Sequence, residues 1–295
     1  TFSVSAAGAS AGRRSLTLAT ERGVARIGFG AMRLSGDTPF RPAPSRRRAF
    51  QVLDAAASAG INFVDTADTY GLGHNEDLLG HYLRVRKGTT LEICTKVGQC
   101  HDGAGRWSPL GDPRYLRQQV YASLQRLGVE HLAALLLHRV DPDYPADEQV
   151  GVLAEFLERG QTAAIGVSGV NAGTLRGLVR SHPITFVQNR QNLETGVDHE
   201  LAVACAELRV TLLSYAPLAL GGRKPDFERL AERWSMSPQQ LSLRWALSRP
   251  DVLPIPGSTN PEHVIGWNVS DLDPLPVEVL QEVSSIINGG DLYAN

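Results

Sequence analysis

Three observations predict that the chain folds as a single (β/α)8 barrel. Eight short apolar runs alternate with amphipathic stretches of helical period along about 250 residues. Most runs are nearly continuous in apolar residues, as expected for parallel strands covered on both faces. No linker or shift in composition divides the 295 residues, and their 42% hydrophobic content supplies ample material for one core.

The eight predicted strands follow one another at intervals that leave room for helices. They are ARIGFG at 25–30, INFV at 61–64, LEICTK at 91–96, LAALLLH at 132–138, AAIGVS at 163–168, ITFVQN at 184–189, VTLLSY at 210–215 and DVLPIPG at 251–257. An open doubly wound sheet is the alternative. It calls for a G-x-G-x-x-G turn after the first strand, whereas GFGAMR at 28–33 has no third glycine.

Helices between the strands carry start and stop signals. The clearest helical periods lie at 113–128, 147–160 and 237–248. Gly128 and Gly160 stand where the first two should end, because glycine readily takes the left-handed backbone that closes a helix. Ser237 and Pro238 form the N-cap and first position of the third.

Composition argues against several classes of function. The formal net charge is −2, and no block of like charge is long enough to indicate a nucleic-acid or membrane surface. The densest basic cluster, Arg46–Arg48, opens a predicted helix and is expected to be a solvated face. No apolar run reaches the ~18 residues of a membrane span.

The cysteines and the N-terminal segment indicate the compartment. Three cysteines without a CxxC pair favour a reducing environment, so we expect a cytoplasmic protein. Residues 1–14 are small and polar with no apolar core, which predicts a flexible tail rather than a signal peptide, followed by a barrel domain at 15–295.

Polar residues stand at the ends of most predicted strands. A barrel of this type places its chemistry at the C-terminal ends of its strands, so these residues should face one mouth. They are Asp65, Tyr70, Lys96, His138, Ser168, Gln188, Asn189, Ser214 and Tyr215. Singly, each has a structural explanation, such as a helix cap for Asp65. Their joint occurrence on successive strands favours a site.

Four of these residues fit an acid–base centre. A tyrosine has a pKa of about 10, and a neighbouring ammonium such as Lys96 lowers it by stabilising phenolate. Asp65 would hold Lys96 charged, and His138 would hydrogen-bond a substrate oxygen. Such a centre protonates the oxygen of a carbonyl. Because no side chain supplies a hydride, a nicotinamide cofactor is implied.

The sequence resembles the aldo-keto reductase family from about Ser15 to Asn268. The blocks that carry the resemblance occur in family order: FVDTADTYG…NEDLLG, TKVG, LLLH, IGVSGVN, VQNRQNL, SYAPLALGG and PIPGSTNPEHV. The resemblance implies that Asp65, Tyr70, Lys96 and His138 form the catalytic tetrad, with Tyr70 as the general acid in reduction.

The resemblance also implies a set of cofactor-binding residues. Ser168 and Gln188 match contacts to the nicotinamide carboxamide, and Tyr215 matches the ring that stacks on the nicotinamide. The other implied positions are Gly30, Ala31, Met32, Pro217, Leu218, Gly221, Gly257, Ser258, Thr259, His263 and Asn268. Three departures stand out: Gly169 replaces a frequent asparagine, His263 a frequent arginine, and Asn268 follows Trp267 instead of a glutamate.

The predicted function is NADPH-dependent reduction of an aldehyde or ketone, with NAD(H) possible. GFGAMRL and LLLHRVDP are similar to bacterial members near the pyridoxal reductases, which makes aromatic aldehydes a first substrate class. Met32, Arg33, Trp107 and Arg139 are candidate substrate contacts. A sugar-type dehydrogenase running in oxidation and a cofactor-binding regulatory subunit stay open, as does the oligomeric state.

A metal site is not expected. His74 and Glu76 have metal-ligating side chains, but the other strand ends offer no matching ligands. Both residues are therefore interpreted as part of a loop and a helix start.

Overall fold

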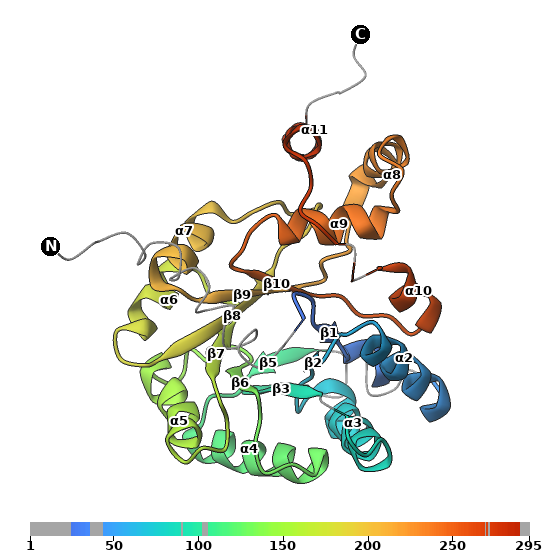
Figure 1. Ribbon diagram of the computed structural model, residues 1–295. Coiled ribbons are helices and arrows are strands. Elements are labelled where there is room, and N and C mark those ends of the chain that lie inside the picture. The colour runs from blue at the N-terminus through green and yellow to red at the C-terminus, as the bar shows by residue number, and fades with distance from the viewer. Residues whose placement is uncertain are drawn as a thin grey trace, which may run out of the picture.

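The computed structural model describes residues 25–35, 44–89, 91–101, 106–268, 270 and 272–289, so the predicted tail at 1–14 lies outside the described residues. Eight parallel strands form the centre of the molecule (Figure 1). They are β1 (Phe29–Gly30), β2 (Phe63–Asp65), β3 (Glu92–Val97), β6 (Ala134–Leu137), β7 (Ile165–Ser168), β8 (Ile184–Arg190), β9 (Thr211–Tyr215) and β10 (Val252–Ile255). Each falls within or overlaps a predicted strand.

The sheet closes into a barrel through its first and last strands. The strands are ordered β1-β2-β3-β6-β7-β8-β9-β10, each paired in parallel with the next. The amides of Gly28 and Gly30 then donate to the carbonyls of Pro254 and Pro256, at 3.0 and 2.8 Å. A Cβ on Gly257 would lie 2.4 Å from the carbonyl oxygen of Gly30, so this seam requires glycine. The barrel prediction is confirmed and the open-sheet alternative is wrong.

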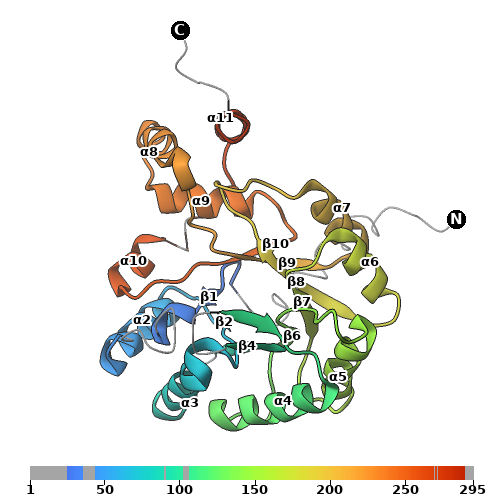
Figure 2. The ribbon, with the colours of Figure 1, turned by 180° about the vertical axis from the view of Figure 1, so that it is seen from behind.

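Most helices surround the strands in chain order, whereas α11 (Val277–Ile287) lies outside this ring and contacts α8 (Lys224–Arg233); Figure 2 gives the same arrangement from behind. The helices are α2 (Arg46–Ser58), α3 (His74–Val85), α4 (Pro113–Leu127), α5 (Ala146–Glu158), α6 (Ala172–Val179), α7 (His199–Leu208), α8 (Lys224–Arg233), α9 (Pro238–Leu247), α10 (Pro261–Gly266) and α11 (Val277–Ile287). The predicted end signals are confirmed: Gly128 has a φ of 67°, Gly160 has a φ of 69°, and Ser237 forms a capping box with Gln240. Helix α10 packs beside α2, which joins the two ends of the ring.

The sequence reasoning did not predict one small sheet. Strands β4 (Gln99–His101) and β5 (Trp107–Pro109) pair in antiparallel fashion after β3. Each has only three residues, too few for a period to be recognised. The imidazole of His101 meets the Trp107 indole edge-on at 4.5 Å between ring centres, which fixes the tryptophan at the barrel mouth.

Side chains inside the barrel are arranged in layers. Because strand residues alternate between faces, residues two apart on one strand point to the same side. Phe63, Cys94, Leu136, Phe186, Leu213 and Ile255 belong to one buried apolar cluster. Two positions further along the same strands stand Asp65, Lys96, His138, Gln188, Tyr215 and Gly257. The polar layer therefore lies directly above an apolar plug, at the C-terminal ends of the strands.

Candidate active site

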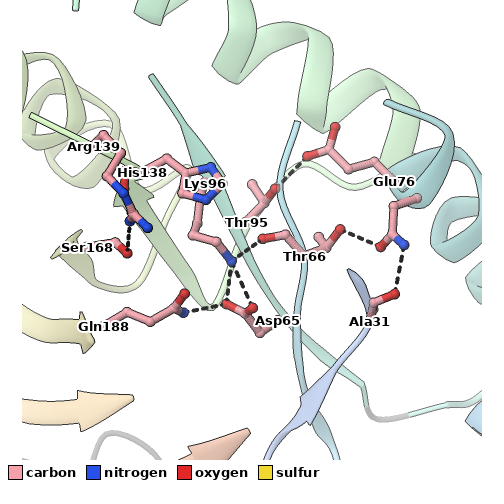
Figure 3. Close-up of polar contacts among 11 residues, drawn as sticks. Ala31, Asp65, Thr66, Glu76, Thr95, Lys96, His138, Arg139, Ser168 and Gln188 are labelled. Carbon is pink, nitrogen blue, oxygen red and sulfur yellow. Dashed lines mark hydrogen bonds and ion pairs between the residues drawn. The ribbon is translucent and has the colours of Figure 1, made fainter. Parts of the chain in front are cut away.

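Lys96 and Asp65 form a buried ion pair at the centre of the polar layer (Figure 3). Lys96 Nζ donates to both carboxylate oxygens of Asp65 at 2.8 Å and to the Thr66 carbonyl at 2.7 Å. Gln188 Nε2 donates to Asp65 Oδ1 at 2.7 Å. Lys96 is fully buried and Asp65 nearly so. The charge of each partner is thus compensated where water cannot solvate it.

Tyr70 lies against this pair and against His138. It opens the 3₁₀ helix Tyr70–Gly73, in which Gly71 and Leu72 have positive φ angles of 57° and 52°. That turn carries the phenol back over the barrel mouth. Its ring centre lies 5.0 Å from Lys96 Nζ and 5.7 Å from the imidazole centre, with the two rings edge to face. The four predicted tetrad residues are therefore brought together.

The electrostatics of the site favour a protonated tyrosine. Burial raises the pKa of Tyr70 above its ordinary value and outweighs the opposing effect of the Lys96 charge, while Asp65 raises it further. Lys96 thus acts in the predicted direction, but the predicted net lowering of this pKa is wrong, because desolvation of phenolate is the larger effect.

His138 and Lys96 differ in charge: the imidazole is neutral and the ammonium is charged. Burial, Lys96 and Arg139 hold the pKa of His138 well below its ordinary value, so the imidazole is neutral near pH 7. Its Nδ1 is buried and has no hydrogen-bond partner among the described residues. Burial alone would lower the pKa of Lys96, but Asp65 and Tyr70 raise it above the usual value. The ammonium therefore stays charged.

A cavity of about 720 Å³ opens above the polar layer. Most of the predicted site residues line it: Gly30, Met32, Asp65, Tyr70, Trp107, His138, Arg139, Ser168, Gln188, Tyr215, Pro217, Leu218 and Gly257. Tyr215 is followed by Ala216, whose φ of 50° is unusual for a residue with a Cβ. The Asn192 side chain donates to the Ala216 carbonyl at 3.0 Å and holds this turn against the cavity.

The remaining predicted cofactor residues lie outside the cavity wall. Ala31 is buried beside it, and the predicted catalytic residue Lys96, also absent from the wall, is buried against Asp65. Gly221 belongs to the 3₁₀ helix Gly221–Arg223. Ser258, Thr259, His263 and Asn268 lie on and after the loop that leads into α10. Ser258 Oγ is within 3.3 Å of His263 Nδ1 and accepts a hydrogen bond from the Asn260 amide.

Two residues expected at the mouth do not line the cavity. Asn189 follows Gln188, and Ser214 precedes Tyr215, so the alternation of strand residues turns both away from the interior. Ser214 Oγ donates to the Gln191 carbonyl at 2.6 Å. The Asn189 side chain accepts from the Gly169 amide and donates to the Val170 carbonyl. Both are structural, and the prediction that they face the mouth is wrong.

Sequence reasoning missed several cavity residues and one contact. Gln99, Ala216, Ala219, Ile255 and Pro256 also line the cavity and carry no chemical signal in the sequence. Arg33, expected at the substrate pocket from its position just after the first strand, also lines the cavity.

The missed contact involves Arg48, from the basic cluster predicted to be a solvated face. Arg48 is exposed, but its guanidinium donates to the Thr259 carbonyl at 3.2 Å and to Asn260 Oδ1 at 2.7 Å. Arg48 and Thr259 are 211 residues apart in the sequence, and only the packing of α10 beside α2 makes their contact possible.

A second network of buried polar residues supports the site from behind. Glu76 accepts from Thr95 Oγ1 at 2.5 Å and forms an ion pair with Arg126 at 2.7 Å. Asn75 joins Thr66 to the Ala31 carbonyl. Glu76 is therefore structural, and no group of three or more metal-ligating side chains occurs in the described part of the chain.

The cavity residues suit a nicotinamide cofactor. A half-buried tyrosine ring, Tyr215, forms part of the wall, and the polar residues Ser168 and Gln188 line the cavity from the two preceding strands of the barrel, β7 and β8. At Gly30 and Gly257 the backbone itself borders the cavity. An aromatic platform, a few hydrogen-bonding groups and exposed backbone are what a planar amide-bearing ring with an attached phosphate chain requires.

Comparisons with known proteins agree with this geometry. The model of the Aldo/keto reductase family matches residues 26–288. An uncharacterised oxidoreductase of Schizosaccharomyces pombe is 34% identical over 245 residues, covering 82% of this chain and 79% of the relative. A probable aldo-keto reductase of Glycine max is 32% identical over 304 residues, covering 91% and 87%. The structure of a glycerol dehydrogenase from Gluconobacter oxydans superposes with a TM-score of 0.81 at 23% identity, covering 90% and 92%.

None of the helices in the described residues is both long enough and apolar enough to cross a membrane.

Proposed function

The chain belongs to the aldo/keto reductase family and is an NAD(P)H-dependent oxidoreductase, and we propose that it reduces an aldehyde or ketone to the alcohol with NADPH. One observation carries this proposal. A neutral tyrosine shares one cavity with a neutral histidine, and both lie beside a buried ammonium that an aspartate keeps charged.

Tyr70 is the proposed general acid. Its raised pKa keeps the proton on the phenol in the resting enzyme, which is the form that protonates a carbonyl oxygen. As negative charge develops on that oxygen, the proton leaves the Tyr70 hydroxyl and a phenolate forms next to Lys96. The lysine charge stabilises this phenolate more than the neutral phenol, so it favours the transition state over the ground state.

His138 is proposed to orient the carbonyl. A neutral imidazole carries one N–H donor and one acceptor nitrogen, so it can hydrogen-bond the substrate oxygen without delivering a full positive charge. Its edge-to-face contact with Tyr70 places both groups on the same side of the cavity. When bound, the reduced nicotinamide supplies the hydride that no side chain provides.

The residues proposed to hold the cofactor form a path along the cavity. Ser168 and Gln188 would bind the carboxamide, and Tyr215 would support the ring. Gly30, Ala31, Met32, Pro217, Leu218, Gly221 and Gly257 would border the ribose and pyrophosphate, and Ser258, Thr259, His263 and Asn268 the adenosine. Arg48 joins this last group, because it gives the Thr259–Asn260 segment a permanent cation. A 2′-phosphate would be attracted there, which supports NADPH over NADH.

The proposed substrate is a small carbonyl compound that contacts Met32, Trp107 and Arg139 at the cavity rim. A reducing compartment such as the cytoplasm is proposed from the three cysteines, which are all free.

The decisive experiment follows nicotinamide absorbance with a panel of aldehydes and ketones, once with NADPH and once with NADH. Reduction of several members, faster with NADPH at low cofactor concentration, is expected. The matching alcohols with NADP⁺ and NAD⁺ test the reverse direction, in which a sugar-type dehydrogenase would be active. Turnover with the alcohols and none with the carbonyls would refute the proposed direction.

A further inference from the structure

Arg139 stands beside the proposed catalytic groups in a fixed position. It directly follows His138, and its Nη1 donates to the His138 carbonyl at 2.7 Å and to Ser168 Oγ at 2.8 Å (Figure 3). The side chain is partly buried and lines the cavity. Nε and Nη2 have no hydrogen-bond partner among the described residues. One edge of the guanidinium is therefore anchored, and its other donors remain available.

The backbone next to Arg139 leaves space for the guanidinium. Gly169 has a φ of 70°, and a Cβ there would lie 2.9 Å from Nη1 and 3.0 Å from Cζ of Arg139. Asn189 fixes this glycine by accepting its amide hydrogen at 3.0 Å. A larger residue at 169 would therefore displace the guanidinium. The glycine and the arginine act together as one feature of the cavity wall.

The cavity carries an excess of positive charge. Among the described residues that line it, Arg33 and Arg139 are permanently charged cations, and Asp65 is the one carboxylate. Asp65 is already neutralised by its ion pair with Lys96. Neither arginine has a carboxylate partner among the described residues. A cavity of this kind attracts an anion, and a guanidinium with two available nitrogens, which carry three N–H groups, binds carboxylate in preference to neutral oxygen.

We propose that Arg139, seated over Gly169 and anchored by Ser168, binds a carboxylate of the carbonyl substrate and so selects oxo acids over neutral aldehydes and ketones. This rests on the proposed reductase function and names its substrate class. Because Arg139 directly follows His138 and is bonded to the His138 carbonyl, the carboxylate and the reacting carbonyl of the substrate would be held at a fixed separation. Arg139 is thus a specificity-determining residue, while proton transfer belongs to Tyr70.

The test compares acids with their neutral counterparts. Carboxybenzaldehydes with the acid at the 2-, 3- or 4-position are assayed against their methyl esters with NADPH. For at least one position, the wild type is expected to show a kcat/KM at least tenfold higher for the acid. Arg139→Met should lower that acid-to-ester ratio by roughly 10- to 100-fold, the effect of losing a charge-assisted hydrogen bond. Arg139→Lys should recover part of it.

Three further variants locate the effect. Gly169→Asn tolerates the left-handed backbone but displaces the guanidinium, so it should lower the ratio although Arg139 is present. Arg33→Met removes the other cavity cation and should change the ratio less. Arg190→Met removes an exposed charge that is paired with Glu194 outside the cavity wall, and should leave the ratio unchanged.

Binding measurements separate this inference from the proposed function. Benzoate should bind the wild-type enzyme with NADP⁺ more tightly than benzamide in a calorimetric titration, and Arg139→Met should remove the difference. Equal rates for acids and esters at all three positions, or an unchanged ratio in Arg139→Met, would overturn the inference while leaving the reductase in place. If Arg139→Met lowered the affinity for NADPH by the same factor as it lowered the acid-to-ester ratio, the residue would be assigned to the cofactor instead. If no carbonyl is reduced, the proposed function fails, and benzoate binding alone decides the role of Arg139.

Discussion

Replacing Tyr70 by phenylalanine tests the proposed acid most directly. The change removes the hydroxyl and keeps the ring that packs against His138 and Lys96. Because the Lys96–Asp65 pair does not use that hydroxyl, the fold and cofactor affinity should survive. A positioned general acid contributes roughly 10²–10⁴-fold, or about 2.7–5.4 kcal/mol of activation free energy. Single-turnover reduction, followed by NADPH absorbance, should slow by that factor.

Replacing Lys96 by methionine acts on the same proton but also on stability. Asp65 would lose the ammonium and keep Gln188 as its neighbouring donor, which leaves a buried carboxylate nearly uncompensated. Breaking such a pair costs about 3–5 kcal/mol, so Lys96→Met should lower the melting temperature. The Asp65→Asn, Lys96→Met double variant removes both charges and should recover much of that loss. It therefore separates the loss of stability from the loss of rate.

The pH dependence of the chemical step has a defined sign. Lys96 opposes the rise of the Tyr70 pKa, so removing it raises that pKa further and makes the phenol a weaker acid. The protonated form then persists to higher pH, but each proton transfer is slower. The rate losses of Tyr70→Phe and Lys96→Met should not be additive, because both substitutions impair the same proton transfer. Should Tyr70→Phe keep more than about a tenth of the wild-type chemical step, the acid is another group, with His138 the next candidate.

Three further predictions concern binding and stability. Tyr215→Ala should weaken NADPH binding in a fluorescence titration by about 0.5–1.5 kcal/mol beyond lost burial, and Tyr215→Phe should be nearly silent; equal losses would indicate a hydroxyl contact. Arg48→Ala should reduce NADPH affinity roughly two- to fivefold at low salt, with NADH affinity and the exposed control Arg47→Ala unchanged; equal losses for both cofactors would remove Arg48 from the phosphate site. Asp68 is buried, neither of its carboxylate oxygens has a hydrogen-bond partner among the described residues, and burial and Glu76 raise its pKa well above the ordinary value. Its folded-state pKa exceeds the unfolded one, so its contribution to stability falls as pH rises from the unfolded pKa towards the folded one. Asp68→Asn should therefore raise the melting temperature by a margin that grows with pH, on the order of 2–4 °C per kcal/mol, whereas a margin constant between pH 5 and 8 would contradict the shift.

The alternation of apolar runs with amphipathic helical stretches predicted the barrel. It also predicted most of the site, because the strand ends in this fold converge on one mouth. Gln188 and Tyr215 were placed correctly for that reason. The same rule put Asn189 and Ser214 at the mouth, where the alternation of strand residues excludes them. The same alternation, counted along each predicted strand, distinguishes Gln188 and Tyr215, which face the interior, from Asn189 and Ser214, which do not.

Other features depend on contacts that no local pattern encodes. Arg48 reaches Thr259 only because α2 and α10 close the ring. The guanidinium of Arg139 fits over Gly169 because two neighbouring strands set their spacing. The direction of the Tyr70 pKa depends on how far burial outweighs one nearby charge, and this balance requires the packed structure.

The contacts of Lys96 indicate how this residue acts on Tyr70. An ammonium has three N–H donors, and the three contacts of Lys96 Nζ go to the two Asp65 oxygens and the Thr66 carbonyl. The Lys96 charge, 5.0 Å from the ring centre of Tyr70, and a hydrogen bond between Lys96 and Tyr70 both act to lower the pKa of the phenol. His138 and the cavity lie beside the phenol, and we propose that Tyr70 recovers its proton through them after each turnover.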